Sequence, residues 1–298
     1  MASKISTKNK GTICVVLIIS VVFLCKIALS EERENFKRKL SINFTTGYCS
    51  MNVGDLNTYL KSFDNYLRET TNYEGGKIKT LYYFPEISLE LRWDLSSRFA
   101  VNVGMGVMSE KKESSFEFTE DDSPYIYYRH YYIEQEIKVL PLILKSHYSA
   151  LLSSRVHLSL NFGLAYYFSK CYLTIHESLP IMPLPMTCSV NTKGPGLICG
   201  IGLEYNLASF LVLMIEAQGR YSKLRKLEGY TYGFYGFGED GEGILYIGEK
   251  YYAADDRYRP YLITSRSKPS GGDFINIREA VLDLRGFSLK FGIRIRLF

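Results

Sequence analysis

Hydrophobic and polar residues alternate along this chain with a period of two, and the alternation recurs in eight segments. In the last segment, residues 286–298, apolar side chains occupy every second position up to Leu297, and serine, lysine, glycine and arginine lie between them. Successive side chains of a strand point to opposite faces, so each segment predicts a strand with one apolar and one polar face. The predicted strands are residues 39–48, 78–93, 98–108, 131–144, 156–168, 196–205, 210–224 and 286–298.

The connections between these strands are alternately short and long. Tight turns are predicted at residues 94–97, 151–154 and 206–209, and long loops at residues 49–77, 109–130, 176–194 and 226–279. Short turns at one end and long loops at the other are typical of a membrane barrel. We therefore predict an all-β fold, an eight-stranded antiparallel up-and-down transmembrane β-barrel with long extracellular loops. A secreted β-sandwich is the alternative for the same alternation.

An amphipathic strand ending on Phe298 resembles the C-terminal signature of bacterial outer-membrane barrels. With the strand pattern, it makes the chain similar to the small eight-stranded barrels of the OmpA, OmpX and OmpW type. The resemblance implies an integral outer-membrane protein that contacts outer-membrane lipids and lipopolysaccharide. It also implies recognition of the C-terminal strand by the barrel-assembly machinery. The expected role is structural, surface-interactive or, as in the OmpW type, a narrow route for small apolar compounds.

The N-terminus has the layout of a signal peptide. Lys4, Lys8 and Lys10 precede an uncharged run from Gly11 to Cys25, and small residues follow before the charged segment that begins at Glu31. The run is shorter than the roughly 20 apolar residues of a spanning helix. We expect residues 1–30 to be a signal peptide and residues 31–298 to form the barrel domain.

Projecting the polar faces inward gathers charges of both signs in the lumen. Eight strands leave an interior that side chains can fill, and buried charges must be paired. We therefore expect a hydrogen-bonded plug and no open pore. The predicted lumen charge network is Glu86, Glu90, Arg92, Arg98, Glu134, Glu136, Lys138, Arg155, Glu204, Glu216, Arg220, Lys290, Arg294 and Arg296.

The charge pattern and the motifs exclude several function classes. Charged residues are mixed along the chain without a polybasic tract, which argues against nucleic-acid binding. No metal-ligand spacing or phosphate loop is present, so we expect neither a metal nor a cofactor. His157 and Ser159 resemble the His-x-Ser pair of lipid A deacylases, but a place in the plug is favoured for His157. We expect a non-enzymatic scaffold; a narrow channel or carrier is the alternative, and a lipid A-modifying enzyme is less favoured.

Two long loops and the cysteines carry further expectations. Leu56, Leu60, Phe63 and Leu67 recur at helical spacing behind Asp55, which predicts an amphipathic helix. Packing on its own loops is favoured for this helix; the alternatives are that it rests on the outer leaflet, covers the lumen or meets a partner. Residues 226–279, rich in glycine and tyrosine, predict a solvated loop in which strands seven and eight extend as a hairpin around residues 239–243. A bridge between Cys171 and Cys188 is plausible. Aromatic girdles are expected at both ends, at Tyr48, Tyr82, Tyr83, Tyr131, Tyr132, Tyr166, Tyr167 and Tyr221 and at Trp93, Phe99, Phe210 and Phe298.

Overall fold

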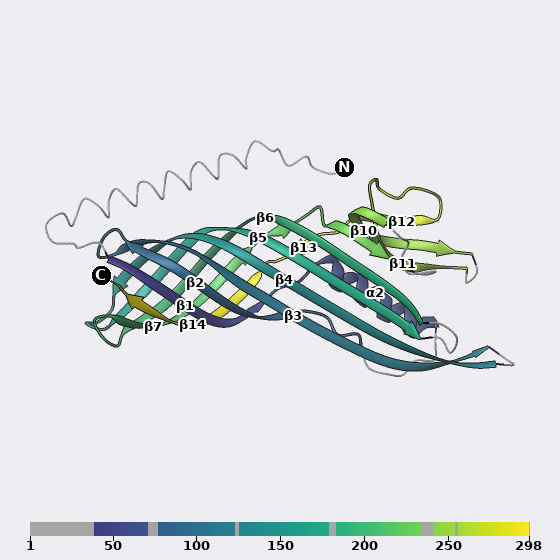
Figure 1. Cartoon of the computed structure of the whole chain (residues 1–298), viewed down its shortest axis with the longest axis horizontal. Helices are drawn as coiled ribbons and strands as arrows, with labels where there is room; N and C mark the ends of the chain where they lie inside the picture. The colour runs from purple at the N-terminus through teal and green to yellow at the C-terminus, as the bar shows by residue number, and fades with distance from the viewer. Residues whose placement is uncertain are drawn as a thin grey trace.

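Eight antiparallel strands close into a ring, in which the last strand pairs with the first (Figure 1). This computed structural model describes residues 39–70, 77–122, 125–178, 183–233, 241–253 and 256–297, so the predicted signal peptide and Phe298 lie outside the described residues. The predicted eight-stranded antiparallel barrel is confirmed. In ring order its strands are β1 (Lys39–Ser50), β2 (Tyr83–Asp94), β3 (Phe99–Asp122), β4 (Tyr125–Leu151), β5 (Val156–Ser178), β6 (Pro183–Asn206), β7 (Leu211–Tyr221) and β14 (Gly286–Arg296).

The three tight turns share one geometry. They occupy residues 95–98, 152–155 and 207–210, each one position later than predicted. In each turn the leucine N–H at the start donates to the carbonyl four residues later. These bonds are Leu95 to Phe99 at 2.8 Å, Leu152 to Val156 at 2.9 Å and Leu207 to Leu211 at 3.0 Å. The repeated Leu-Ser-Ser-Arg sequence therefore encodes the same turn at residues 95–98 and 152–155.

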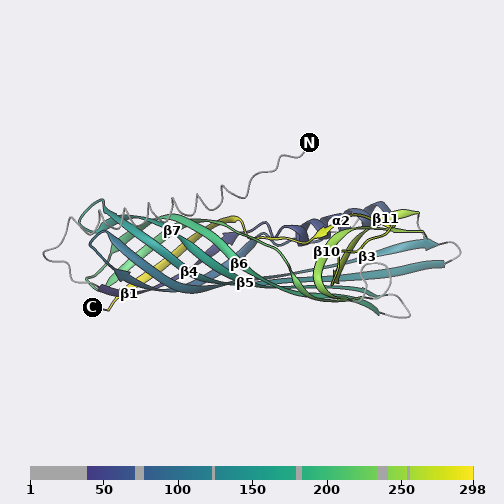
Figure 2. The same ribbon diagram turned by 90° about the horizontal axis from the view of Figure 1, so that it is seen from above.

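Two of the predicted long loops are instead strands. β3 and β4 stay paired from Ser109–Lys138 up to Asp122–Tyr125, and β5 and β6 stay paired from Tyr167–Gly194 up to Ser178–Pro183. The sequence prediction ended these strands where their outward faces stop being apolar. The backbone pairing continues beyond that point, so the β3–β4 hairpin projects far past the short-strand part of the barrel (Figures 1 and 2).

The interior of the barrel changes character along its length. Near the tight turns the inward side chains are polar, for example Asn43, Asn161 and Glu204, whereas the outward ones are apolar. In the extended part of β4 the order is reversed, because Ile133 and Ile137 are buried and face inward. The outward face of the lower barrel therefore suits a lipid bilayer, and the outward face of the upper part suits water.

The first long loop forms α2 (Asp55–Thr70), as predicted. Leu56, Leu60, Phe63 and Leu67 are each no more than 2% exposed, because they pack into the apolar core of the upper part. The expected packing of the helix on its own loops is confirmed. The Asp55 carboxylate binds outside the helix, where it accepts a hydrogen bond of 2.8 Å from the Val281 N–H and contacts the Arg278 guanidinium.

In its described residues, the last long connection folds into six further strands and is not the solvated loop that we expected. The strands are β8 (Lys223–Leu224), β9 (Glu228–Tyr232), β10 (Gly241–Tyr252), β11 (Arg257–Ser265), β12 (Phe274–Glu279) and β13 (Leu282–Asp283). Four of them, β9 to β12, continue the sheet of the barrel, and β8 and β13 form a separate pair. Leu245 and Leu262 are fully buried, and their strands pack against α2.

β7 ends at Tyr221 and β14 begins at Gly286, so these two strands do not extend upward as the predicted hairpin. Residues 239 and 240 of its predicted tip lie outside the described residues. β9 continues the sheet by pairing with β6 at residues 187–191.

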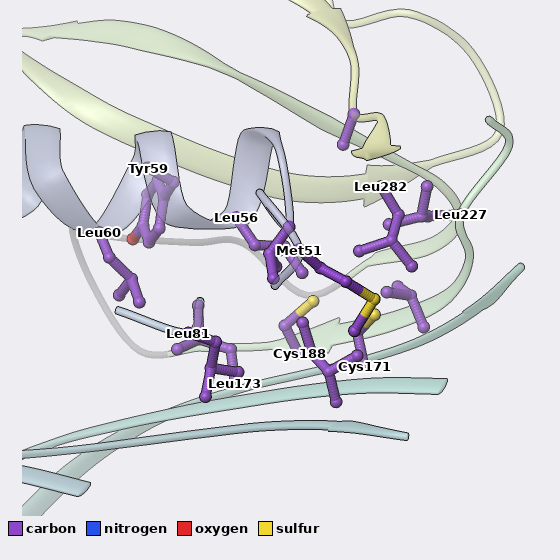
Figure 3. Packing of buried hydrophobic residues seen from close by; sticks show 14 of the residues in the cluster. Met51, Leu56, Tyr59, Leu60, Leu81, Cys171, Leu173, Cys188, Leu227 and Leu282 are labelled. Carbon is purple, nitrogen blue, oxygen red and sulfur yellow. The ribbon is translucent and has the colours of Figure 1, made fainter. Parts of the chain in front are cut away.

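We call α2, β8–β13 and the upper parts of β3–β6 the head. Its main core is an apolar cluster that joins the helix to the inward faces of the strands (Figure 3). Met51 contributes from the segment before α2, Leu56 from α2 and Leu282 from β13, and Cys171 and Cys188 contribute from β5 and β6. This cluster meets the polar interior of the lower barrel at Met108, which Arg220 contacts. A second, smaller cluster of Tyr246, Tyr261, Ile263 and Ile277 lies among β10, β11 and β12.

Candidate functional site

The candidate site is the charged interior of the lower barrel. Of the fourteen predicted network residues, seven are buried there: Glu86, Glu90, Arg92, Glu204, Arg220, Lys290 and Arg294. Glu216 and Arg296 are partly buried and also face inward. These nine side chains come from β2, β6, β7 and β14, in which inward residues alternate with apolar outward residues. They form three groups stacked along the barrel.

The group nearest the tight turns is centred on Glu204. Its carboxylate accepts two hydrogen bonds from the Arg294 guanidinium, at 2.7 and 2.8 Å. Arg92 lies 3.5 Å from the same carboxylate and 2.6 Å from Asp94. His147 places its Nε2 atom 2.8 Å from Glu204 Oε1. A bidentate arginine contact of this kind fixes the position of both side chains.

The middle group is held by Lys145. Its Nζ atom lies 2.9 Å from Glu90 Oε1 and 3.4 Å from Glu216 Oε1. Asn102 donates to the second Glu90 oxygen at 2.9 Å. One lysine therefore joins β2, β4 and β7 across the interior.

The upper group is centred on Glu86. Its carboxylate lies 2.7 Å from Lys290 Nζ and 3.2 Å from Arg220 Nη2. Lys290 also donates to Gln218 at 3.3 Å. Arg220 contacts the sulfur of Met108, at the border of the apolar cluster above. The charge pairing thus ends where the core of the head begins.

Lys145 and His147 belong to the network although the prediction omitted them. The predicted fourth strand ended at residue 144, whereas β4 continues to Leu151. Both residues follow Ile143 at every second position and therefore share its inward direction. Finding them would have required extending the strand through residue 147 and also taking Leu142 and Leu144 as its outward residues.

Five of the predicted network residues are not in the lumen. Glu134, Glu136 and Lys138 lie on the outward face of β4, because the apolar face of this segment fills the core of the head. Arg98 and Arg155 are exposed in two of the tight turns. For the β4 residues the alternation was recognised, but its inside and outside were exchanged.

Almost no free space remains within the network. The cavity between Asn43, Glu90, His147, Glu204 and Arg294 has a volume of about 10 Å³. Such a volume is about the smallest that admits a single water molecule. Charges of both signs line this cavity, so the arrangement can hold the strands of the lower barrel together.

The outward face of the lower barrel is an apolar belt. Its side chains are roughly 40 to 56% exposed and come from all eight strands, among them Phe44, Leu89, Leu91, Val103, Met105, Leu142, Leu144, Leu160, Leu164, Ile201, Leu203, Leu213, Ile215, Leu289 and Phe291. A closed sheet with an apolar exterior and a charged interior is stable in hydrocarbon, because all its backbone groups are paired. This is the architecture of an outer-membrane β-barrel.

Comparisons with solved structures find similar barrels. The attachment invasion locus protein Ail of Yersinia pestis, in complex with the heparin analogue sucrose octasulfate, is 12% identical; the match covers 87% of this chain and 97% of that chain, with a TM-score of 0.33. A major outer membrane protein from Thermus thermophilus is 14% identical over 88% of this chain and 100% of that chain, with a TM-score of 0.40. The outer membrane protease OmpT from Escherichia coli is 8% identical; the match covers 89% of this chain and 100% of that chain, with a TM-score of 0.26.

Neither a family model nor a curated protein matches this sequence. At these identities the structural similarities concern architecture, and function has to be inferred from the residues of this chain. The barrel architecture itself rests on the closed ring of eight antiparallel strands in this chain. No helix in the described part of the chain is long and apolar enough to span a bilayer.

The aromatic girdles form in part. Tyr48, Tyr83, Tyr166 and Tyr221 are exposed at the upper border of the belt, and Trp93 and Phe210 are exposed at the lower border. Tyr131, Tyr167 and Phe99 are buried instead. Tyr131 and Tyr167 have odd positions on β4 and β5, which face the interior. For Tyr131 and Tyr167 the girdle prediction is wrong, because it followed position along the strand and ignored the direction of the side chain. Phe99 has the outward parity of Val103 on β3 and is nevertheless covered, at 8% exposure.

Other candidate chemistry is not assembled. The His157 ring lies 3.0 Å from the Asn206 amide, and Ser159 is buried two positions further along β5. Among the described residues no three histidine, cysteine, aspartate or glutamate side chains converge as metal ligands. Cys171 and Cys188 are free thiols two register positions apart on β5 and β6, so the plausible bridge does not form.

Proposed function

We propose that this protein is a non-enzymatic, non-conducting scaffold of the bacterial outer membrane, whose barrel anchors the head at the cell surface. The paired charges of the lower barrel carry this proposal. Five cations, Arg92, Lys145, Arg220, Lys290 and Arg294, face five carboxylates, Glu86, Glu90, Asp94, Glu204 and Glu216. Ion pairs that fill a barrel cross-link its strands and occupy the route that a solute would take.

The head supports a surface role. It is formed by the connections between the barrel strands and by the upper parts of β3–β6, and it buries an apolar core of its own above the membrane. Exposed tyrosines such as Tyr230, Tyr232 and Tyr258 give it an adaptable outer surface. Recognition of β14 by the barrel-assembly machinery is part of the same proposal.

Conductance in planar bilayers tests the closed lumen. The purified full-length protein should give no stable channel currents, under conditions in which a general porin conducts. A Glu90→Ala, Glu216→Ala double variant that still shows heat-modifiable gel migration should conduct more than the wild type, because two of the filling side chains are shortened. Steady currents through the wild-type protein would contradict the proposed scaffold and support the channel alternative.

Analysis of lipid A tests the absence of catalysis. Mass spectra of lipid A from cells that express the protein should equal those from cells with the empty vector. A change in acylation that disappears in His157→Ala or Ser159→Ala would instead establish the enzyme alternative.

A further inference from the structure

A surface groove with a volume of about 900 Å³ lies outside the barrel, where the apolar belt meets the head. Outward residues of β3–β6 and the connection from β8 to β9 line it. Five of the lining residues are cations: Lys138, Lys170, Lys193, Arg225 and Lys226. Glu228 is the one carboxylate among the described residues of the lining. The groove is therefore strongly basic.

The lower wall of the groove is the edge of the belt. On β4, the outward residues change from Leu140 to Lys138, and on β5 they change from Phe168 to Lys170. Leu140 is the register partner of Phe168, and Lys138 is the partner of Lys170. The change from apolar to cationic therefore occurs at one level on both strands, at the depth of the outer-leaflet headgroups.

Lys138 and Lys170 place two ammonium groups opposite each other on neighbouring strands. Like charges directly opposite each other on antiparallel strands repel. Lys138 has a carboxylate 2.8 Å away, Glu136, whereas the Lys170 ammonium lies over the Tyr172 ring at 4.6 Å. An anion between the two lysines would remove this repulsion.

The upper cations are held in place by the fold. Thr192 donates a hydrogen bond of 2.8 Å to the Arg225 carbonyl, which fixes this segment against β6. Lys226 has a positive φ of 53°, and the next residue, Leu227, is fully buried. The buried leucine holds the backbone in a conformation that non-glycine residues rarely adopt. Arg225 and Lys226 are thus preorganised above the groove.

The opposite side of the barrel lacks this arrangement. Where β1, β2 and β7 leave the belt, the outward residues are Tyr48, Tyr83 and Tyr221. These side chains suit any headgroup level. Arg285 also lies on this side, over the Tyr221 ring at 5.9 Å, but it is paired with Asp283 at 2.5 Å. Among the described residues, the five cations that line the groove are therefore a local cluster and not part of a uniform girdle.

We propose that this basic groove binds the phosphorylated sugar headgroup of an outer-leaflet lipid of the lipid A class. The acyl chains lie on the belt below, beside Leu140 and Phe168, and the phosphates contact Lys138, Lys170, Lys193, Arg225 and Lys226. The inference rests on the outer-membrane location in the proposed function, and it is independent of the closed lumen.

Native mass spectrometry of the detergent-extracted protein tests the groove. The probes are bisphosphorylated lipid A, the same lipid after removal of its phosphates, and free glucosamine phosphate. The wild type should bind the bisphosphorylated lipid at least about tenfold more tightly than a Lys170→Gln, Lys193→Gln variant, because each cation near a membrane surface adds appreciable attraction. The matched control is Arg266→Gln, Lys268→Gln, which removes two exposed cations outside the groove lining.

Each outcome is decisive. The control variant should bind like the wild type, and loss of the phosphates should weaken binding as much as the groove variant does. Equal binding by the groove variant and the wild type, or by lipids with and without phosphates, would overturn the proposal. Equally tight binding of free glucosamine phosphate would assign the groove to a soluble anion. Heat-modifiable migration of every variant shows that the barrel is folded, and the bilayer currents test the scaffold separately.

Discussion

At the scale of single residues, the account depends on charges that are buried together. Glu204 is 5% exposed and accepts both hydrogen bonds from Arg294, with Arg92 and His147 beside it. Removing one member of a buried charge group leaves the others without compensation, which costs more than the group contributes as a whole.

Glu204→Gln should therefore lower the free energy of unfolding by about 3–5 kcal/mol, because Arg294 and Arg92 keep their charges in the interior. Urea unfolding in detergent micelles measures the change. Glu113→Gln is the matched control, since its side chain is 51% exposed and pairs with Lys111 at the surface. The control should unfold like the wild type. Equal effects of the two substitutions would show that the cluster is not buried as described.

The thiols of the head add a pH dependence. Burial raises the pKa of Cys171 from its ordinary value of about 9.0 to about 12, and burial also raises the pKa of Cys188. A thiol with a raised pKa in the folded state stabilises fully below pH 9, and this stabilisation is lost as pH rises from about 9 to about 12. Between these limits the unfolded chain releases a proton that the folded chain keeps.

The free energy of unfolding should consequently fall from pH 8 to pH 11 by less in Cys171→Ala than in the wild type. Urea titrations at pH 8 and pH 11 measure this fall in the free energy of unfolding. The cavity left by the substitution lowers the free energy of unfolding equally at both pH values, so it cancels in the comparison. Cys199→Ala, at an exposed position on the outward face of β6, should retain the wild-type pH dependence. An identical fall in all three proteins would contradict the burial of Cys171.

At the scale of elements, the sequence pattern predicted where strands occur better than which way they face. Repeated alternation placed all eight barrel strands, because one face of each meets apolar surroundings along its lower part. For Glu134, Glu136 and Lys138 the same alternation was assigned to the lumen. A period of two does not say which face is inside, and the inside of the head is apolar whereas the inside of the lower barrel is charged. The partners of Lys145 were beyond prediction, since they come from β2 and β7 and depend on how the ring closes.

The start of α2 makes a prediction about the head. Gly54 precedes the helix with a φ of 63°, and a Cβ atom there would lie 2.5 Å from the Val281 carbonyl oxygen. Gly54→Ala should lower the melting temperature of the head and increase its proteolysis at α2, because the backbone and Val281 must both move. Gly272→Ala is the control, since a Cβ atom at this glycine would meet no atom within 4 Å. Similar protection of both variants from protease would show that the α2 junction tolerates a side chain.

At the scale of the whole molecule, one continuous sheet faces lipid along its lower part and water along its upper part. The strands β3–β6 pass from the belt into the head without a break, and the polarity of both their faces reverses on the way. The charged interior is enclosed by lipid, and the apolar interior is enclosed by water. This reversal lets the same strands enclose a charged interior within the membrane and an apolar core in the head outside it.

Spin labels placed along the outward face of β4 test this reversal most directly. Labels are attached one at a time at Glu136→Cys, Leu142→Cys and Leu144→Cys, in a variant whose native cysteines are serine, and the protein is reconstituted in lipid bilayers. Labels at 142 and 144 should collide mainly with oxygen, which concentrates in the hydrocarbon, and the label at 136 should collide mainly with a water-soluble nickel complex. Equal access of the nickel complex to all three positions would contradict a membrane-embedded lower barrel.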